Sequence, residues 1–152
     1  FWMSGNLVDA SWDKVRLILP YSVVGCITAA LLARPLNALQ LGEEVASGLG
    51  VSVERTRLIA MAAASLLAAA AVSVAGLIGF VGLVVPHLMR LLTGHEHGRL
   101  LPMAMAAGAA LMVWADLGAR TMLAPTELPV GILTALIGGP YFIFLLYRKK
   151  LL

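Results

Sequence analysis

Charged residues are scarce in this chain. Asp, Glu, Lys and Arg make up 12% of its 152 residues, whereas hydrophobic residues make up 61%. The mean hydropathy of +0.93 exceeds what a soluble domain of this length can bury, because a globular protein must still cover its surface with polar groups. The composition therefore predicts a protein of the lipid bilayer.

Several other features are also missing. Cys26 is the single cysteine, which excludes a disulfide framework within the chain. No basic cluster alternates with aromatic residues, so the formal net charge of +3 indicates basic residues kept in cytoplasmic loops rather than nucleic-acid binding. The chain starts at Phe1 without a charged region before a short apolar stretch, from which we expect no signal peptide and a piece of a longer protein. It has no linker and no short repeat, so residues 1–152 are expected to form one membrane unit.

Intervals without charge predict the membrane helices, because a charge at the bilayer centre costs roughly 3 kcal/mol or more. These intervals are residues 17–33, 58–89, 100–115 and 128–147. Three have the length of one span, about 20 residues with flanking residues. The second is too long for one span and contains Gly76, Gly79, Gly82 and Pro86, which permit turns or remove a helical hydrogen bond. We therefore expect a helix that ends near Gly76, a turn, and a short second helix.

The loop charges support this division. With five crossings that start outside, the inner cations are Arg34, Arg55, Arg57, Arg90, Arg99, Arg148, Lys149 and Lys150, and the outer ones are Lys14, Arg16 and Arg120. With four crossings the better orientation places seven cations inside and four outside. Because cytoplasmic loops carry the excess of Lys and Arg, the pattern favours five crossings. The expected fold is an all-α, polytopic bundle of about five transmembrane helices.

The stretch LNALQLGEEVASGLGV, residues 36–51, interrupts the apolar runs and lies on the cytoplasmic side of this topology. Asn37 is expected to cap a first short helix, and Gly42 to break it. Glu43 and Glu44 then lie in the first turn of a second short helix, where carboxylates favour the positive end of the helix dipole.

The second short helix is expected to end at Gly48 and Gly50. In it, Val45 and Leu49 share one face, whereas the carboxylates turn toward water or a partner. Two short helices with an apolar ridge would fit a groove on a soluble protein. The alternative is a helix that rests on lipid headgroups, although acidic residues and the absence of Lys argue against anionic lipid.

Three motifs together resemble a known family. They are LNALQLGEEVASGLGV, GLIGFVGLVVPHLMRLL at residues 76–92, and ADLGARTMLAPTELPVGILTALIGGPYFIFLL at residues 115–146. In this order and at this spacing they are similar to the second half of the permease subunits of type II ABC importers, which take up ferric siderophores, haem and cobalamin. The resemblance runs from about Trp12 to the end.

The resemblance implies a permease of ten transmembrane helices in the bacterial plasma membrane, of which this chain resembles helices six to ten. It also implies a second permease copy as homodimer or pair, two cytoplasmic ATPase subunits and an extracytoplasmic substrate-binding protein. Ferric siderophore is the expected cargo, with haem and cobalamin fitting equally well. The path lies beside the last helix, and ATP and magnesium bind the partner ATPase.

Individual residues follow from the same resemblance. Those implied in coupling to the ATPase are Leu41, Gly42, Glu43, Glu44, Ala46, Leu49 and Gly50. Those of the glycine-rich turn and the short helix are Gly79, Gly82, Pro86, His87 and Arg90, the last three near the cytoplasmic end of that helix. In the last helix Gly138, Gly139 and Pro140 are expected to bend or thin the helix, which suits either packing or a gate.

The third motif carries Asp116, Arg120 and Glu127 toward the outer surface. By resemblance, Arg120 docks on a glutamate of the binding protein, since an Arg fork grips a carboxylate with two hydrogen bonds. The alternative is an ion pair within the chain with Asp116, four residues earlier on the same helix face.

No residue pattern predicts catalysis. The histidines His87, His95 and His97 lack further ligands at the spacing of a metal site, and the chain has no phosphate-binding glycine loop. We therefore expect a subunit without cofactor or metal and without enzymatic activity of its own. The rival function is a secondary transporter driven by an ion gradient, which usually needs ionisable groups at mid-membrane; the four apolar intervals contain no Asp, Glu, Lys or Arg, and His87 is expected near an end of its interval.

Overall fold

The computed structural model describes residues 5–121 and 128–150, the last three by their backbone only. These residues form seven helices and no strand. The helices are α1 (Trp12–Leu31), α2 (Ala33–Gln40), α3 (Glu43–Gly48), α4 (Val53–Ala75), α5 (Val81–Thr93), α6 (His97–Thr121) and α7 (Val130–Lys150). The predicted all-α class is confirmed.

Four helices, α1, α4, α6 and α7, are long and apolar enough to cross a membrane. The 13 residues of α5 extend about 20 Å at the rise of an α-helix, whereas the hydrocarbon core of a bilayer is about 30 Å thick. Of the five predicted membrane helices, four therefore reach spanning length, and the fifth is the expected short one.

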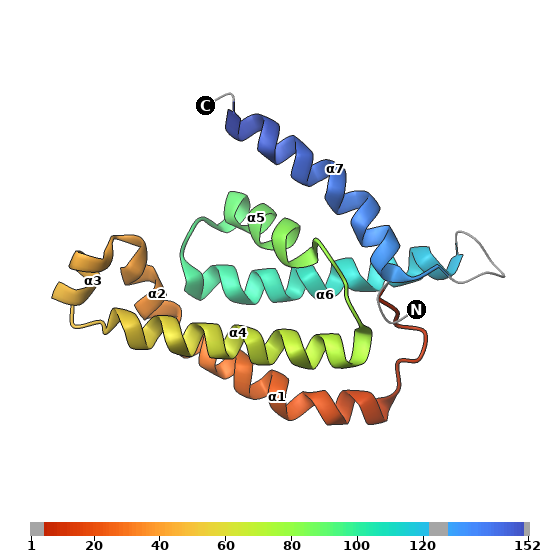
Figure 1. Cartoon of the computed structure of the whole chain (residues 1–152), viewed down its shortest axis with the longest axis horizontal. Coiled ribbons are helices and arrows are strands. Elements are labelled where there is room, and N and C mark those ends of the chain that lie inside the picture. The colour runs from red at the N-terminus through yellow and green to blue at the C-terminus, as the bar shows by residue number, and fades with distance from the viewer. Residues whose placement is uncertain (1–4, 122–127, 151–152) are drawn as a thin grey trace.

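Helix α1 packs along α4, and α5 packs along α6, while α7 contacts both α5 and α6 (Figure 1). The best-buried cluster is Ala115, Ala119 and Val130, where the end of α6 meets the start of α7. In the most apolar 18-residue stretch of each of these four helices, only 6–17% is buried inside the chain. Most of the apolar helix surface is therefore presented to lipid or to further helices.

Short segments gather at the two ends of the helices. At one end lie α2, α3 and the turn between α5 and α6; at the other lie the N-terminal segment and the start of α7 (Figure 1). The amide of Gln40 on α2 donates to the carbonyl oxygen of His95 in the α5–α6 turn at 2.9 Å. This contact places residues 40 and 95 on the same side, as five crossings require and four crossings do not.

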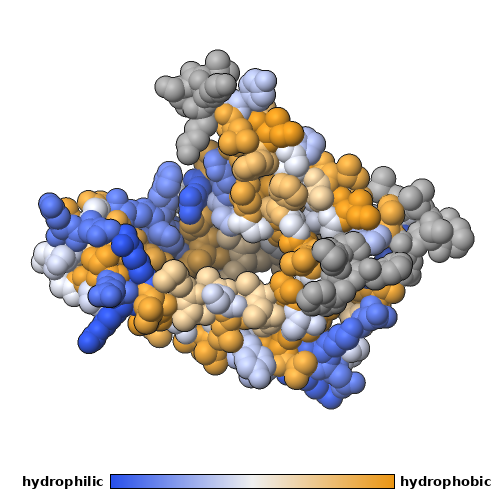
Figure 2. Space-filling model, viewed as in Figure 1, coloured by the Kyte–Doolittle hydropathy of each residue, from blue (hydrophilic) through white to orange (hydrophobic). Residues whose placement is uncertain are grey.

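Hydrophilic residues gather at these two ends, and hydrophobic side chains cover most of the visible face between them (Figure 2). The hydrophilic end at the left of the view contains α2 and α3. A belt of apolar surface between two polar ends is the distribution that a bilayer favours.

The long apolar interval breaks where the glycines predict. Helix α4 ends at Ala75, and Gly76 follows at φ 70°, a conformation that glycine adopts without strain. The residue in the left-handed region before α5 is Phe80, at φ 67°, and not Gly79.

The expected position of the second motif needs a correction. Gly82 lies in the first turn of α5, and Pro86 and His87 lie near the middle of that helix rather than at its cytoplasmic end; only Arg90 lies in the last turn. The helix continues for about two turns past Pro86 because the next break is Gly94, at φ 80°.

Helix α7 continues without a break through Gly138, Gly139 and Pro140. Gly138 is buried against Phe80, and a Cβ atom there would overlap the Phe80 side chain. The ring of Tyr141 meets the ring of His87 edge to face, with 6.2 Å between the centroids. Gly138 therefore packs against Phe80, and a gate at this point of the last helix stays a prediction.

Candidate functional site

Helix α2 starts one residue after α1 ends, with Leu32 between them. Pro35 falls in the first turn of α2, where a proline is tolerated because its missing N–H has no partner there. The prediction that Asn37 caps this helix is wrong, because Asn37 lies inside α2. Its side-chain oxygen accepts a hydrogen bond instead from the backbone N–H of His97 at 2.8 Å.

Gly42, at φ 106°, separates α2 from α3. Glu43 and Glu44 occupy the first turn of α3, the helix ends at Gly48, and Gly50 follows at φ 82°. The predicted break, acidic first turn and end are confirmed. The positive φ values at the two flanking glycines explain why these positions take glycine.

The apolar side chains of this segment point outward. Leu41, Val45 and Leu49 are 66%, 48% and 65% exposed, whereas Ala46 is fully buried. We call Leu41, Val45 and Leu49 the apolar ridge. Helix α3 thus rests on Ala46, and the larger apolar residues in it and directly beside it are exposed, at the hydrophilic end of the molecule.

The two glutamates of α3 differ in their contacts. Glu43 forms an ion pair with Arg57 of α4, and about 60% of each of these side chains is exposed. Glu44 is exposed and takes part in none of the ion pairs found among the described residues. Glu43 therefore ties α3 to α4, while Glu44 is the carboxylate that faces away from the fold.

The histidines of the α5–α6 turn contact α2. Besides its bond to His95, the amide nitrogen of Gln40 lies 3.0 Å from Nδ1 of His97, and Oδ1 of Asn37 lies 2.8 Å from the same nitrogen. Depending on the tautomer of His97, this nitrogen accepts from Gln40 or donates to Asn37, but it does not do both at once. Within residues 5–121 and 128–150, no three His, Cys, Asp or Glu side chains are grouped as metal ligands.

Near the opposite end, Nε of Arg120 donates to Oδ2 of Asp116 at 2.8 Å. A terminal nitrogen of Arg120 also donates to the carbonyl oxygen of Leu7 at 3.3 Å. The alternative of a pair within the chain is therefore formed, with 42% of the Arg120 side chain still exposed. Docking of Arg120 on a binding protein stays a prediction, and Glu127 lies outside the described residues.

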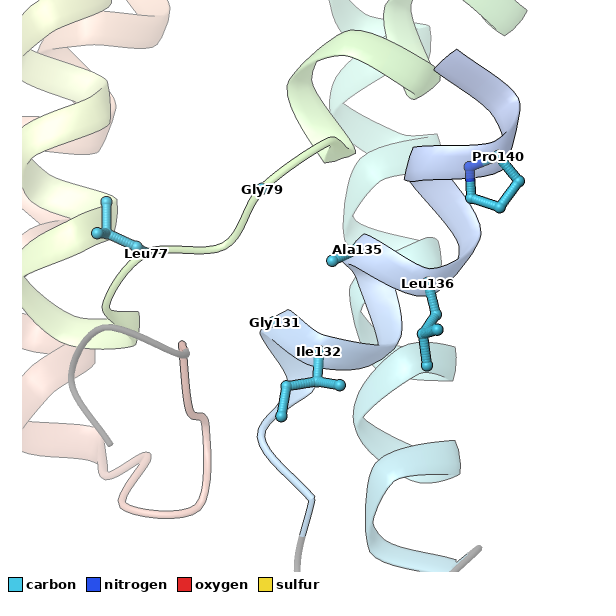
Figure 3. A pocket seen from close by; sticks show the side chains of 7 residues that line it. All are labelled: Leu77, Gly79, Gly131, Ile132, Ala135, Leu136 and Pro140. Atoms are coloured by element: carbon cyan, nitrogen blue, oxygen red, sulfur yellow. The ribbon is translucent and has the colours of Figure 1, made fainter. Parts of the chain in front are cut away.

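An open cavity of about 680 Å³ lies between the chain that follows α4 and the first half of α7. Figure 3 shows Leu77 and Gly79 on one side and Ile132, Ala135 and Leu136 on the other. Gly131 and Pro140 also line it. Among the residues that the structure describes, none of the lining side chains is ionisable.

Comparison with known proteins decides the family. A model of the FecCD transport family matches residues 1–148. The chain belongs to the FecCD transport family. The resemblance found in the three motifs is thereby confirmed, and with four apolar helices of spanning length the chain is part of a multi-pass membrane protein.

Curated relatives carry several transport names. The hemin transport system permease protein HmuU of Yersinia pestis is 47% identical over 98% of this chain and 45% of its own length. The cobalamin import system permease protein BtuC of Halobacterium salinarum is 49% identical over 99% of this chain and 40% of its own length. The iron(3+)-hydroxamate import system permease protein FhuG of Bacillus subtilis is 44% identical over 98% of this chain and 44% of its own length.

A solved structure has the same fold. An ABC transporter of the metal-chelate type, in an inward-facing conformation, superposes with a TM-score of 0.85 and 37% identity over 97% of this chain and 48% of that chain. The present chain thus spans less than half the length of these relatives.

Proposed function

We propose that the chain is the second half of a permease in an ATP-binding-cassette importer of the plasma membrane. The cargo is a ferric siderophore or a related haem or corrinoid compound, the classes named for its relatives. The chain itself is non-catalytic. ATP and magnesium bind two cytoplasmic ATPase subunits, a second permease copy completes the path, and an extracytoplasmic protein delivers the cargo.

The observation that carries this proposal is the apolar ridge. Three large apolar side chains are exposed at the polar end of the molecule, in α3 or directly beside the short helices, in a segment that the apolar spans do not include. Exposed apolar groups on a short helix favour insertion into a groove of another protein. An ATPase subunit that binds this ridge would transmit the closing motion of the ATPase to the membrane helices through α2 and α3.

Co-purification with the ATPase tests the proposal. In the permease that contains this chain, Leu49→Asp places a charge on the ridge, and Glu44→Lys reverses the outward carboxylate. Glu54→Lys is the matched control, since Glu54 is an exposed carboxylate in the first turn of α4. We expect Leu49→Asp and Glu44→Lys each to lose about tenfold or more in ATPase binding, with the Glu54→Lys control unchanged.

The rival function makes the opposite forecast. A secondary transporter has no ATPase to bind, so all three variants would behave alike. Its import would persist without ATP and vanish when the ion gradient is collapsed.

A further inference from the structure

The helices form two groups that touch at few places. One group is α1 to α4, and the other is α5 to α7. Among the described residues, only the pairs α1–α6 and α2–α6 join the groups by more than sparse contact. At the end of the molecule where α2 and α3 lie, every side-chain hydrogen bond between the two groups in the described part of the chain involves Asn37 or Gln40 of α2.

Those bonds hold the start of α6. His97 is the first residue of α6, and the first N–H groups of a helix have no partner within the helix. Oδ1 of Asn37 accepts from this N–H, so Asn37 caps α6 across the gap between the two groups. Gln40, one turn later on α2, fixes the carbonyl of His95 just before the same helix.

Helix α2 is also the neighbour of the ridge. It contacts α3 directly, and only Leu41 and Gly42 separate the two helices. A displacement of α3 would reach α2 through these contacts, and the hydrogen bonds between α2 and the start of α6 would pass it to the first turn of α6.

We propose that Asn37, Gln40 and His97 form the link through which the coupling segment moves α6. We call these three residues the α2–α6 link. They are positioning residues that act on the transport cycle and touch neither ATP nor cargo. This inference rests on the proposed function, since it presupposes an ATPase that moves α3.

The test uses the complete importer in proteoliposomes, with its ATPase, its binding protein and the transported cargo. Asn37→Leu removes both oxygen contacts at similar volume, whereas Asn37→Asp keeps an acceptor oxygen. His95→Ala is the matched control, because His95 is an exposed neighbour that contributes only its backbone oxygen. The measured quantity is cargo imported per ATP hydrolysed, together with the amount of bound ATPase.

We expect Asn37→Leu to bind ATPase normally and to import about fivefold less cargo per ATP, the size of a typical coupling between sites. Asn37→Asp and His95→Ala should stay within about twofold of the original protein. A wild-type ratio in Asn37→Leu would overturn the link, as would an equal loss in His95→Ala. If Asn37→Leu does not assemble, Gln40→Met is judged by the same ratio, and an unchanged ratio there also overturns the link.

Failure of the proposed function gives a separate result. In that case the unaltered permease itself shows no import that depends on ATP, before any variant is compared. Failure of the link alone leaves ATP-driven import intact in every variant.

Discussion

Phe80 lies against the backbone of Gly138, so that the start of α5 is seated on the middle of α7. Phe80 is the one non-glycine residue with a positive φ among those described. A bulky residue rarely adopts this conformation, which costs of the order of 1–3 kcal/mol and persists where the surroundings hold it. The flat surface offered by Gly138 is the surrounding that accommodates the Phe80 side chain.

Gly138→Ala should destabilise the bundle. Its new Cβ would overlap Phe80, and overpacking of this kind costs about 1–3 kcal/mol. Gly139→Ala is the matched control, because nothing lies within 4 Å of a Cβ built there. Thermal unfolding in detergent should show a lower midpoint for Gly138→Ala and an unchanged one for Gly139→Ala.

Phe80→Gly should rescue this defect. Glycine removes the colliding atoms and adopts positive φ without strain, so the double variant should melt closer to the original protein than Gly138→Ala alone. Equal midpoints for Gly138→Ala and Gly139→Ala would show that the two residues are not in contact.

Gly25 makes the corresponding approach between α1 and α4. A Cβ there would lie 2.5 Å from Cγ of Leu67, and small residues at such crossings let membrane helices pack closely. Gly25→Ala should lower the free energy of unfolding by about 1–3 kcal/mol, which would be seen as a lower unfolding midpoint. Leu67→Ala in the same chain should recover part of this loss. Gly108→Ala, with open space around it on α6, should melt like the original; a similar loss there would contradict specific packing.

Local signals in the sequence predicted the breaks between helices well. Gly42 and Gly76 adopt positive φ, a property that depends only on the residue itself. Asn37 shows the limit of such signals. It has the chemistry of a cap, yet the helix that it caps begins 60 residues later at His97, and no local spacing reveals a partner so distant. Phe80 was missed for another reason, because the left-handed region normally takes Gly, Asn or Asp.

Glu43 and Arg57 should behave as a structural pair. Exposed ion pairs contribute about 1 kcal/mol or less to stability, so Glu43→Lys is expected to leave the fold intact. It should loosen the contact of α3 with α4 and thereby weaken ATPase binding. The charge swap Glu43→Lys with Arg57→Glu should restore ATPase binding, measured by co-purification. If the charge swap does not restore ATPase binding, the ATPase contacts Glu43 directly.

Arg120 should make binding of the substrate-binding protein sensitive to salt. Arg120→Ala removes the exposed guanidinium, and we expect about tenfold weaker binding at low ionic strength, with a smaller difference at high salt. The matched control is Arg16→Ala, which removes a more exposed cation whose carboxylate partner is 3.9 Å away. Equal affinity of both variants and the original, measured by surface plasmon resonance, would leave Arg120 with only its intrachain bonds to Asp116 and Leu7.

The central claim is that ATP hydrolysis drives transport through the apolar ridge. Its most direct measurement is cargo uptake by proteoliposomes that hold the permease containing this chain, its ATPase and its binding protein, with Leu49→Asp run in parallel. We predict that uptake requires ATP, survives collapse of the membrane potential, and falls about tenfold or more in Leu49→Asp. Uptake that proceeds without ATP, disappears with the potential and is unchanged in Leu49→Asp would contradict the account.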